Sequence, residues 1–262
     1  MKRSLISKIP FSIPDEVLAL TENTKIYDSS CSSEAKVYYL EKDSGYYLKC
    51  SEKGTLKTEA LMTKYFHKKG LGAEVVSYLS DEKDWLITRK VCGEDATYRK
   101  FLEEPDKLCV FLAERLRKLH ETDFSDCPVQ NRNESYFDLV ERNHKSGHYD
   151  LSLTDPLFPF RSAYEAYRVF NEGKHLFKSD ALIHGDYCLP NVILNDRFDF
   201  SGFIDLGNAG VGDRHIDIFW GTWTLWFNLG TDKYRSLFLD AYGRENINED
   251  MLKIIAAAEV FG

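Results

Sequence analysis

The chain has 262 residues, of which 43% are hydrophobic and 29% charged, and its formal net charge is −8. These values are those of an ordinary folded globular protein, so they exclude a disordered or fibrous chain. The longest apolar stretches, such as residues 218–227, are far shorter than the roughly 20 residues of a membrane-spanning helix, and residues 1–13 lack the apolar core of a secretion signal. We therefore expect a soluble protein without a membrane partner.

Cysteine spacing indicates a reducing compartment. The six cysteines are widely separated and include no CxxC pair, which argues against a zinc site or a compact disulfide framework. The cytoplasm is the simplest location.

Negative charge is concentrated in the last third of the chain. Residues 180–262 carry 13 acidic and 6 basic residues, whereas residues 1–179 carry 29 and 28. An acidic surface repels nucleic-acid phosphates and attracts cationic ligands or metal ions, although it can also serve solubility alone. The pattern favours a cationic small-molecule partner and no nucleic acid.

The first 90 or so residues alternate between strand and helix patterns. Residues 35–51 predict a β-hairpin around an Asp-Ser-Gly turn, with Lys49 near the end of its second strand. Residues 55–70 have helical spacing, and residues 73–93 predict two further strands around a polar turn. For the helix we expect one buried face, formed by Leu56, Ala60, Leu61 and Tyr65, and an end at Gly70.

Beyond Gly93 the pattern is mainly helical. Helical spacing occurs at residues 106–122, at residues 160–173 and after residue 213, while residues 181–210 predict short strands and loops. We expect an α+β protein with two lobes, a β-rich lobe over residues 1–92 and a helical lobe over residues 93–262. The sequence leaves monomer and homodimer both open.

The segment HGDYCLPN places Asp186 and Asn191 five residues apart, and Ile-Asp-Leu-Gly with Asp205 follows. A loop of this length can aim both side chains at one substrate. Asn191 and Asp205 offer the oxygen ligands that Mg²⁺ prefers, and the Asp186 carboxylate can orient an acceptor hydroxyl and take its proton. This set of side chains indicates phosphoryl transfer from a nucleoside triphosphate.

The first lobe offers the remaining parts of that chemistry. Lys49, on a predicted strand, suits the phosphates of the nucleotide, and Glu59, on the next helix, can hold the lysine in place. Taken singly, this pair favours an ordinary salt bridge over a nucleotide site. Its interpretation as a nucleotide site depends on the later motif.

HGDYCLPNVIL followed by FSGFIDLGNAGVGDRHIDI resembles the aminoglycoside 3′-phosphotransferases, antibiotic-resistance enzymes with a protein-kinase-like fold. The resemblance implies ATP or GTP as donor, bound between the lobes, two Mg²⁺ ions, and transfer of the γ-phosphoryl group to a sugar hydroxyl. It makes Asp186 the catalytic aspartate, and Asn191 and Asp205 the metal ligands. Lys49 and Glu59 match the phosphate-binding lysine and its partner.

Further nucleotide contacts come only from the resemblance. Tyr47 matches a residue that stacks on the nucleobase, and the backbone from Arg89 to Val91 matches the segment that hydrogen-bonds the base edge. Ser33 lies where the family has a serine loop over the terminal phosphates, although no GxGxxG occurs there. His184 and His120 are expected to be structural.

Acceptor recognition departs from the family pattern. The resemblance implies carboxylates from an insert, here residues 140–156 with Asp150, and from the chain end, here Glu259 and Phe261. The insert is only mildly acidic, and Ala258 stands where the family has an aspartate. We expect weakened or altered aminoglycoside binding beside complete phosphoryl-transfer machinery.

Two alternatives remain. One is a related small-molecule kinase that acts on a different amino-sugar, amino-alcohol or antibiotic acceptor. The other is a non-catalytic nucleotide-binding protein, which the intact lysine, base and metal positions argue against.

Overall fold

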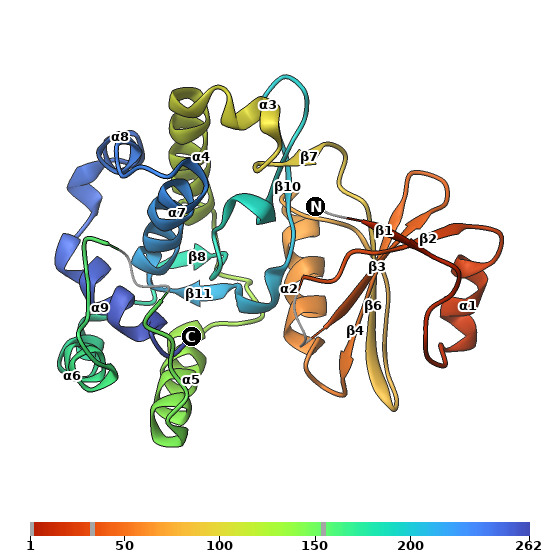
Figure 1. Cartoon of the computed structure of the whole chain (residues 1–262), viewed down its shortest axis with the longest axis horizontal. Coiled ribbons are helices and arrows are strands. Elements are labelled where there is room, and N and C mark those ends of the chain that lie inside the picture. Colours follow the sequence, from red (N-terminus) through yellow and green to blue (C-terminus); the bar gives the residue numbers. More distant parts are fainter. Residues whose placement is uncertain (1–2, 32–34, 153–155) are drawn as a thin grey trace. The chain divides into compact units, whose positions relative to one another are not determined.

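The computed structural model describes residues 3–31, 35–152 and 156–262, and contacts group the chain into two compact units (Figure 1). Unit 1 combines the residues up to Asp95 with a later segment, Val192–Gly207. Unit 2 combines Ala96–Asn191 with Asn208–Gly262. The expected division between residues 92 and 93 gives only one boundary, whereas the later segment Val192–Gly207 returns to unit 1. We propose that boundary only for the point where the chain first passes from unit 1 to unit 2.

Unit 1 is built on a six-stranded antiparallel sheet in the order β1-β2-β3-β4-β6-β5. Its strands are β1 (Ser4–Ile6), β2 (Lys25–Asp28), β3 (Lys36–Glu41), β4 (Tyr46–Glu52), β5 (Val75–Ser80) and β6 (Lys83–Arg89). The predicted hairpin at residues 35–51 is confirmed, with Tyr39 opposite Tyr47 and a turn in which Gly45 has φ +97°, a value that favours glycine. The second predicted strand pair, β5 and β6, is also confirmed.

Helix α2 (Lys57–Lys68) confirms the helix expected before Gly70, and α1 (Asp15–Thr21) is a shorter helix of the same unit. Leu56, Ala60 and Tyr65 are buried as expected, but Leu61 is 41% exposed. The expectation for Leu61 was wrong because the buried stripe of α2 follows Glu59, Met62, Thr63 and Phe66, the i, i+3, i+4, i+7 spacing of one helix face. Leu61 lies outside this stripe.

A second, three-stranded sheet brings the returning segment into unit 1. Its order is β10-β9-β7, from β7 (Glu94–Asp95), β9 (Val192–Leu194) and β10 (Phe200–Phe203). Phe203 N–H donates to the carbonyl of Leu71, just after α2, at 2.8 Å. Asp205 lies two residues beyond β10 and belongs to unit 1.

Unit 2 is mainly helical. Its helices are α3 (Arg99–Leu102), α4 (Pro105–His120), α5 (Arg132–Ser146), α6 (Ala163–Gly173), α7 (Arg214–Leu229), α8 (Tyr234–Tyr242) and α9 (Glu249–Glu259). Four 3₁₀ turns of the described residues are Lys174–Leu176, Leu189–Asn191, Leu206–Asn208 and Arg244–Asn246, and a two-stranded sheet pairs β8 (Ala181–Ile183) with β11 (Gly210–Gly212).

Helix α7 forms the centre of unit 2. It contacts α4, α8 and α9, and most of its side chains are buried, as its apolar sequence predicts. Within the described ranges, no helix is long and apolar enough to span a membrane. The β-rich first part and the helical second part confirm the α+β class.

Candidate active site

Lys49 is held between two carboxylates in unit 1. Its Nζ lies 2.8 Å from Glu59 Oε2 and 2.8 Å from Asp205 Oδ1. The three side chains come from strand β4, the first turn of α2 and the segment after β10. Residues distant in sequence thus form one compact charged cluster.

In this cluster, burial and the neighbouring opposite charges shift the pKa values in opposite directions. Burial alone would lower the pKa of Lys49, but the charges and hydrogen bonds of Glu59 and Asp205 outweigh it and raise that pKa. Burial raises the pKa of Glu59, and the Lys49 charge opposes this effect. Lys49 is therefore a permanent cation at neutral pH. Removing one member of such a largely buried pair leaves an uncompensated charge.

Asp205 has an unusual backbone conformation. Its φ is +59°, in the left-handed region that non-glycine residues rarely adopt. Strain of this kind clusters at functional sites. The side chain is half exposed and could take another partner.

In unit 2, Asp186 and Asn191 are bonded to each other. Asn191 Nδ2 donates to the Asp186 carbonyl at 3.0 Å and to Asp186 Oδ2 at 2.9 Å. The Cys188 N–H also donates to the Asp186 carbonyl at 2.8 Å. The five-residue spacing thus closes a tight loop in which Asp186 stays partly exposed while Asn191 is buried.

Asp217, a fully buried residue of α7, anchors the start of this loop. Its carboxylate accepts the backbone N–H groups of His184 and Gly185, each at 2.7 Å. The ring of His120 also contacts it at 3.2 Å, and the other ring nitrogen of His120 lies 2.8 Å from the Tyr242 hydroxyl. Sequence reasoning assigned no role to Asp217. The available signal was a carboxylate in a mainly apolar helix.

The two histidines are structural, as predicted. His184 is buried, and its Nδ1 accepts the N–H of Asp186 at 3.3 Å. His120 belongs to the buried Asp217 network. Beside His184, Gly185 has φ +81°, and an added Cβ would lie 2.0 Å from the Asn208 carbonyl oxygen, so only glycine fits there.

Glu259 lies at the end of α9 with its carboxylate inside unit 2. Tyr136 donates to Glu259 Oε1 at 2.7 Å, and the indole of Trp220 provides a second hydrogen bond. Burial, together with the charge of Asp186, raises the pKa of Glu259 to about 7. The influence of Asp186 shows that Glu259 is near the HGDYCLPN loop.

The other predicted acceptor residues differ in exposure. The Asp150 carboxylate accepts the N–H of Ser152 at 2.7 Å, and its own backbone N–H donates to the Val260 carbonyl at 2.8 Å. Phe261 is buried against the rings of His144 and Tyr167. Asp150 thus remains available to a ligand, whereas Phe261 anchors the chain end.

The predicted nucleobase residues lie in unit 1. The Tyr47 hydroxyl accepts a hydrogen bond from Arg3 Nη2 at 2.6 Å. Arg89 N–H donates to the Glu74 carbonyl, while Val91 N–H has no partner among the residues that the structure describes. The backbone donor of Val91 could therefore take a base edge. Ser33 lies outside the described residues.

The donor chemistry of Asn191 and Asp205 fits Mg²⁺. Both Asn191 contacts use its amide nitrogen, so its carbonyl oxygen is the atom of unit 2 that could serve a metal, and Asp205 offers a carboxylate in unit 1. No cluster of three or more His, Cys, Asp or Glu suited to a metal occurs in the described part of the chain. A metal bound by either residue would need further oxygens, such as those of phosphate and water.

Comparisons with known proteins cover nearly the whole chain. The model of the phosphotransferase enzyme family matches residues 31–253. A probable aminoglycoside 3′-phosphotransferase of Lactococcus lactis is 49% identical over 250 residues, which is 95% of each protein.

Solved structures agree in fold. An aminoglycoside-3′-phosphotransferase of type VIII superposes with a TM-score of 0.71 at 26% identity, over 90% of this chain and 91% of that one. An aminoglycoside phosphotransferase from Streptomyces rimosus, in complex with ADP and streptomycin, gives 0.70 at 21% identity, over 86% and 90%. The kinase-like fold and the resemblance drawn from the motifs are confirmed.

Proposed function

From the premise that the chain belongs to the phosphotransferase enzyme family, we propose that it is an aminoglycoside 3′-phosphotransferase. It transfers the γ-phosphoryl group of ATP or GTP to a hydroxyl of a cationic aminoglycoside. The observation that carries this proposal is the geometry of the partly exposed Asp186. Its carboxylate accepts a hydrogen bond from Asn191, and the buried Asp217 binds the two backbone N–H groups that precede it.

Asp186 acts as the base. Its Oδ2 accepts the Asn191 amide, so Oδ1 is the atom that accepts the hydrogen bond of the acceptor hydroxyl and then its proton. The acceptor oxygen bonds to the γ-phosphorus as the bond to the β,γ-bridging oxygen breaks, and ADP or GDP leaves.

Lys49 serves the nucleotide. Its fixed cation neutralises phosphate oxygens, and Glu59 keeps its Nζ in place. Tyr47 and the backbone from Arg89 to Val91 receive the base, and Ser33 belongs to the loop over the terminal phosphates. These assignments rest on the family pattern together with two donors of unit 1, Lys49 Nζ and the backbone N–H of Val91.

Asn191 and Asp205 would hold Mg²⁺, which neutralises phosphate charge when bound. Asp205 Oδ1 also bonds Lys49. Asp205 therefore has to share its carboxylate, which its half-exposed position allows.

Acceptor binding involves Glu259 and Asp150, and Phe261 holds the chain end in place. Ala258 is fully buried, so no carboxylate reaches the acceptor from that position. This observation favours a second candidate, a kinase of the same family whose acceptor is an amino sugar or amino alcohol with fewer ammonium groups.

The test measures ADP and GDP release by the purified chain with Mg²⁺ and each triphosphate. The acceptors are kanamycin, neomycin, a 3′-deoxy aminoglycoside and choline. Turnover of kanamycin and neomycin but not of the 3′-deoxy compound is expected. Turnover of choline alone supports the second candidate, and turnover of none contradicts both.

The proposal includes a cytoplasmic location, because the donor nucleotide is there, and a monomer or homodimer. The six cysteines are free thiols, as a reducing compartment requires.

A further inference from the structure

Three aromatic side chains follow one another along α7. Trp220, Trp223 and Phe227 have i, i+3, i+7 spacing, which places them on one helix face. The ring centroids of Trp220 and Trp223 are 5.3 Å apart at 79°, and those of Trp223 and Phe227 are 4.9 Å apart at 12°. We call these three residues the aromatic ladder.

The ladder begins at Glu259 and ends in solvent. Trp220 is half-buried and hydrogen-bonds the Glu259 carboxylate. Trp223 is buried, whereas Phe227 is 60% exposed. The ladder therefore leads from the Glu259 carboxylate to the surface of unit 2.

The C-terminal segment carries few carboxylates. Ala258 is buried, and Glu259 is the single acidic side chain of the segment 251–262. Amino sugars carry ammonium groups and also C–H faces. An aromatic ring attracts both, because its face is negatively polarised and its surface is apolar. An aromatic wall beside one carboxylate suits an amino-sugar ring.

We propose that Trp220 is a specificity-determining residue of the acceptor site. Its indole N–H holds the Glu259 carboxylate, and its ring, supported by Trp223, packs against an amino-sugar ring of the acceptor. This inference rests on the proposed function and extends it to the means of recognition.

The experiment compares Trp220→Leu and Trp220→Phe with the wild-type full chain, using kanamycin and neomycin as acceptors. Trp220→Leu removes ring and donor, so we expect the acceptor KM to rise about 10-fold or more. The KM for ATP stays within about 2-fold, since the nucleotide does not depend on this contact. Unchanged acceptor KM values overturn the inference.

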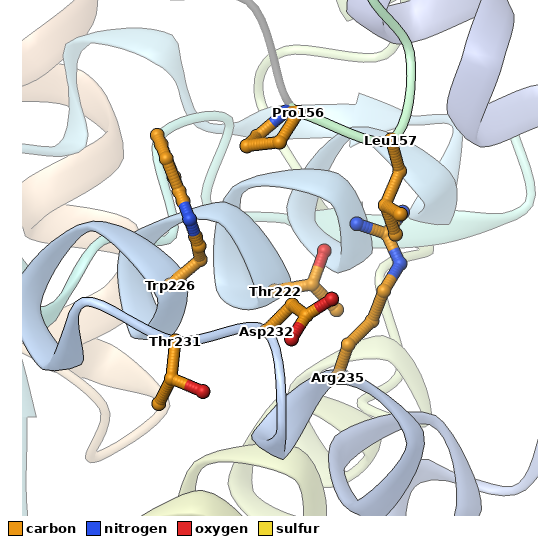
Figure 2. A pocket seen from close by; sticks show the side chains of 7 residues that line it. All are labelled: Pro156, Leu157, Thr222, Trp226, Thr231, Asp232 and Arg235. Carbon is orange, nitrogen blue, oxygen red and sulfur yellow. The ribbon is translucent and has the colours of Figure 1, made fainter.

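Trp226→Leu is the matched control. Trp226 is on the same helix and packs against Trp223, with ring centroids 6.1 Å apart at 64°, but it is not among the side chains that hydrogen-bond Glu259 in the described part of the chain. It lines a pocket together with Thr222, Asp232 and Arg235 (Figure 2). We expect its acceptor KM to stay near the wild-type value. A rise equal to that of Trp220→Leu would show that any loss of bulk on α7 is harmful, and would overturn the inference.

Trp220→Phe keeps a ring and loses only the donor, so it serves if the leucine variant does not fold. Glu259 faces Tyr136 and Arg132 of α5, and Asp186 and Cys188 of the loop. Without the indole N–H its charged form is less stabilised. We expect the acidic limb of kcat/KM for kanamycin in the wild type to follow the raised pKa of Glu259, and we expect Trp220→Phe to move this limb to higher pH. An unmoved limb contradicts the role of the donor.

The two proposals fail in different ways. Wild-type protein that phosphorylates neither kanamycin nor neomycin overturns the proposed function and this inference with it. Wild-type turnover that Trp220→Leu and Trp220→Phe both retain at unchanged KM overturns the inference alone.

Discussion

The two units hold their reactive side chains by different means. In unit 1, Lys49 is positioned by charge: two carboxylates from separate elements meet its Nζ at 2.8 Å. In unit 2, Asp186 is positioned by backbone: Asp217 binds the two N–H groups that precede it, and Asn191 closes the loop after it. One group is balanced by opposite charges, and the other is placed by hydrogen bonds.

This difference matters for what each group does. A cation that must meet several phosphate oxygens tolerates small displacement, because Coulomb attraction varies gradually with distance. A base must lie within hydrogen-bond reach of one proton. The more exacting geometry is therefore built into a rigid loop with a buried anchor. Four substitutions test this comparison.

Asp186→Ala should have the largest effect. It removes the base while leaving the Asp217 anchor, so we expect kcat to fall by about 10²–10⁴-fold. The affinity for ATP, measured by fluorescence titration, should change little. Equal loss of ATP binding and turnover would mean that Asp186 serves the nucleotide instead.

Asp217→Ala should destabilise unit 2 by about 3–5 kcal/mol, because two buried N–H groups and His120 lose their shared acceptor. Urea unfolding measures the change. Asp240→Ala is the control, since the exposed Asp240–Arg244 pair is screened by solvent, so its loss should leave the free energy of unfolding nearly unchanged. Similar values for both variants would refute the anchoring role.

Lys49→Met should raise the KM for ATP by about 10-fold or more, because the phosphates lose a fixed cation. It should spare the fold of unit 2. Lys83→Met removes a lysine from the same sheet whose partner Glu52 is exposed, and it should leave the KM for ATP unchanged. If both variants bind ATP normally, the Lys49 cluster is an ordinary salt bridge.

Glu259→Gln should have the smallest effect of the four. It should raise the free energy of unfolding, so that the variant is more stable than the wild type. The folded-state pKa of Glu259 is raised from 4.5 to about 7, so its folded form favours the proton. The raised pKa therefore contributes its full stabilisation of the folded state below pH 4.5, and this stabilisation is lost as the pH rises to 7. At pH 8 the glutamine variant should therefore be about 1–3 kcal/mol more stable, while the acceptor KM rises.

Thermal unfolding at pH 4 and pH 8 checks this sign. The difference between variant and wild type should be larger at pH 8 than at pH 4. A variant that is less stable at pH 8 would show that the charged carboxylate supports the fold.

Local motifs were predictable because their chemistry lies within a few residues. The hairpin around Gly45 follows from alternation and a turn, and Asp186 and Asn191 come from one loop. The exposed Leu61 was mispredicted because four apolar positions of α2 fit more than one face, and only packing against the sheet selects among them.

The amino-acid sequence by itself determined the hairpin β3–β4, the helix α2, the strand pair β5–β6, the loop of HGDYCLPN and the family. Tertiary structure alone decided that Asp205 meets Lys49 across 156 residues, that Asp217 holds the loop from 33 residues away, and that Trp220 meets Glu259. The physical reason is that propensity and spacing act over a few residues, whereas ion pairs and buried hydrogen bonds depend on which surfaces the whole chain packs together.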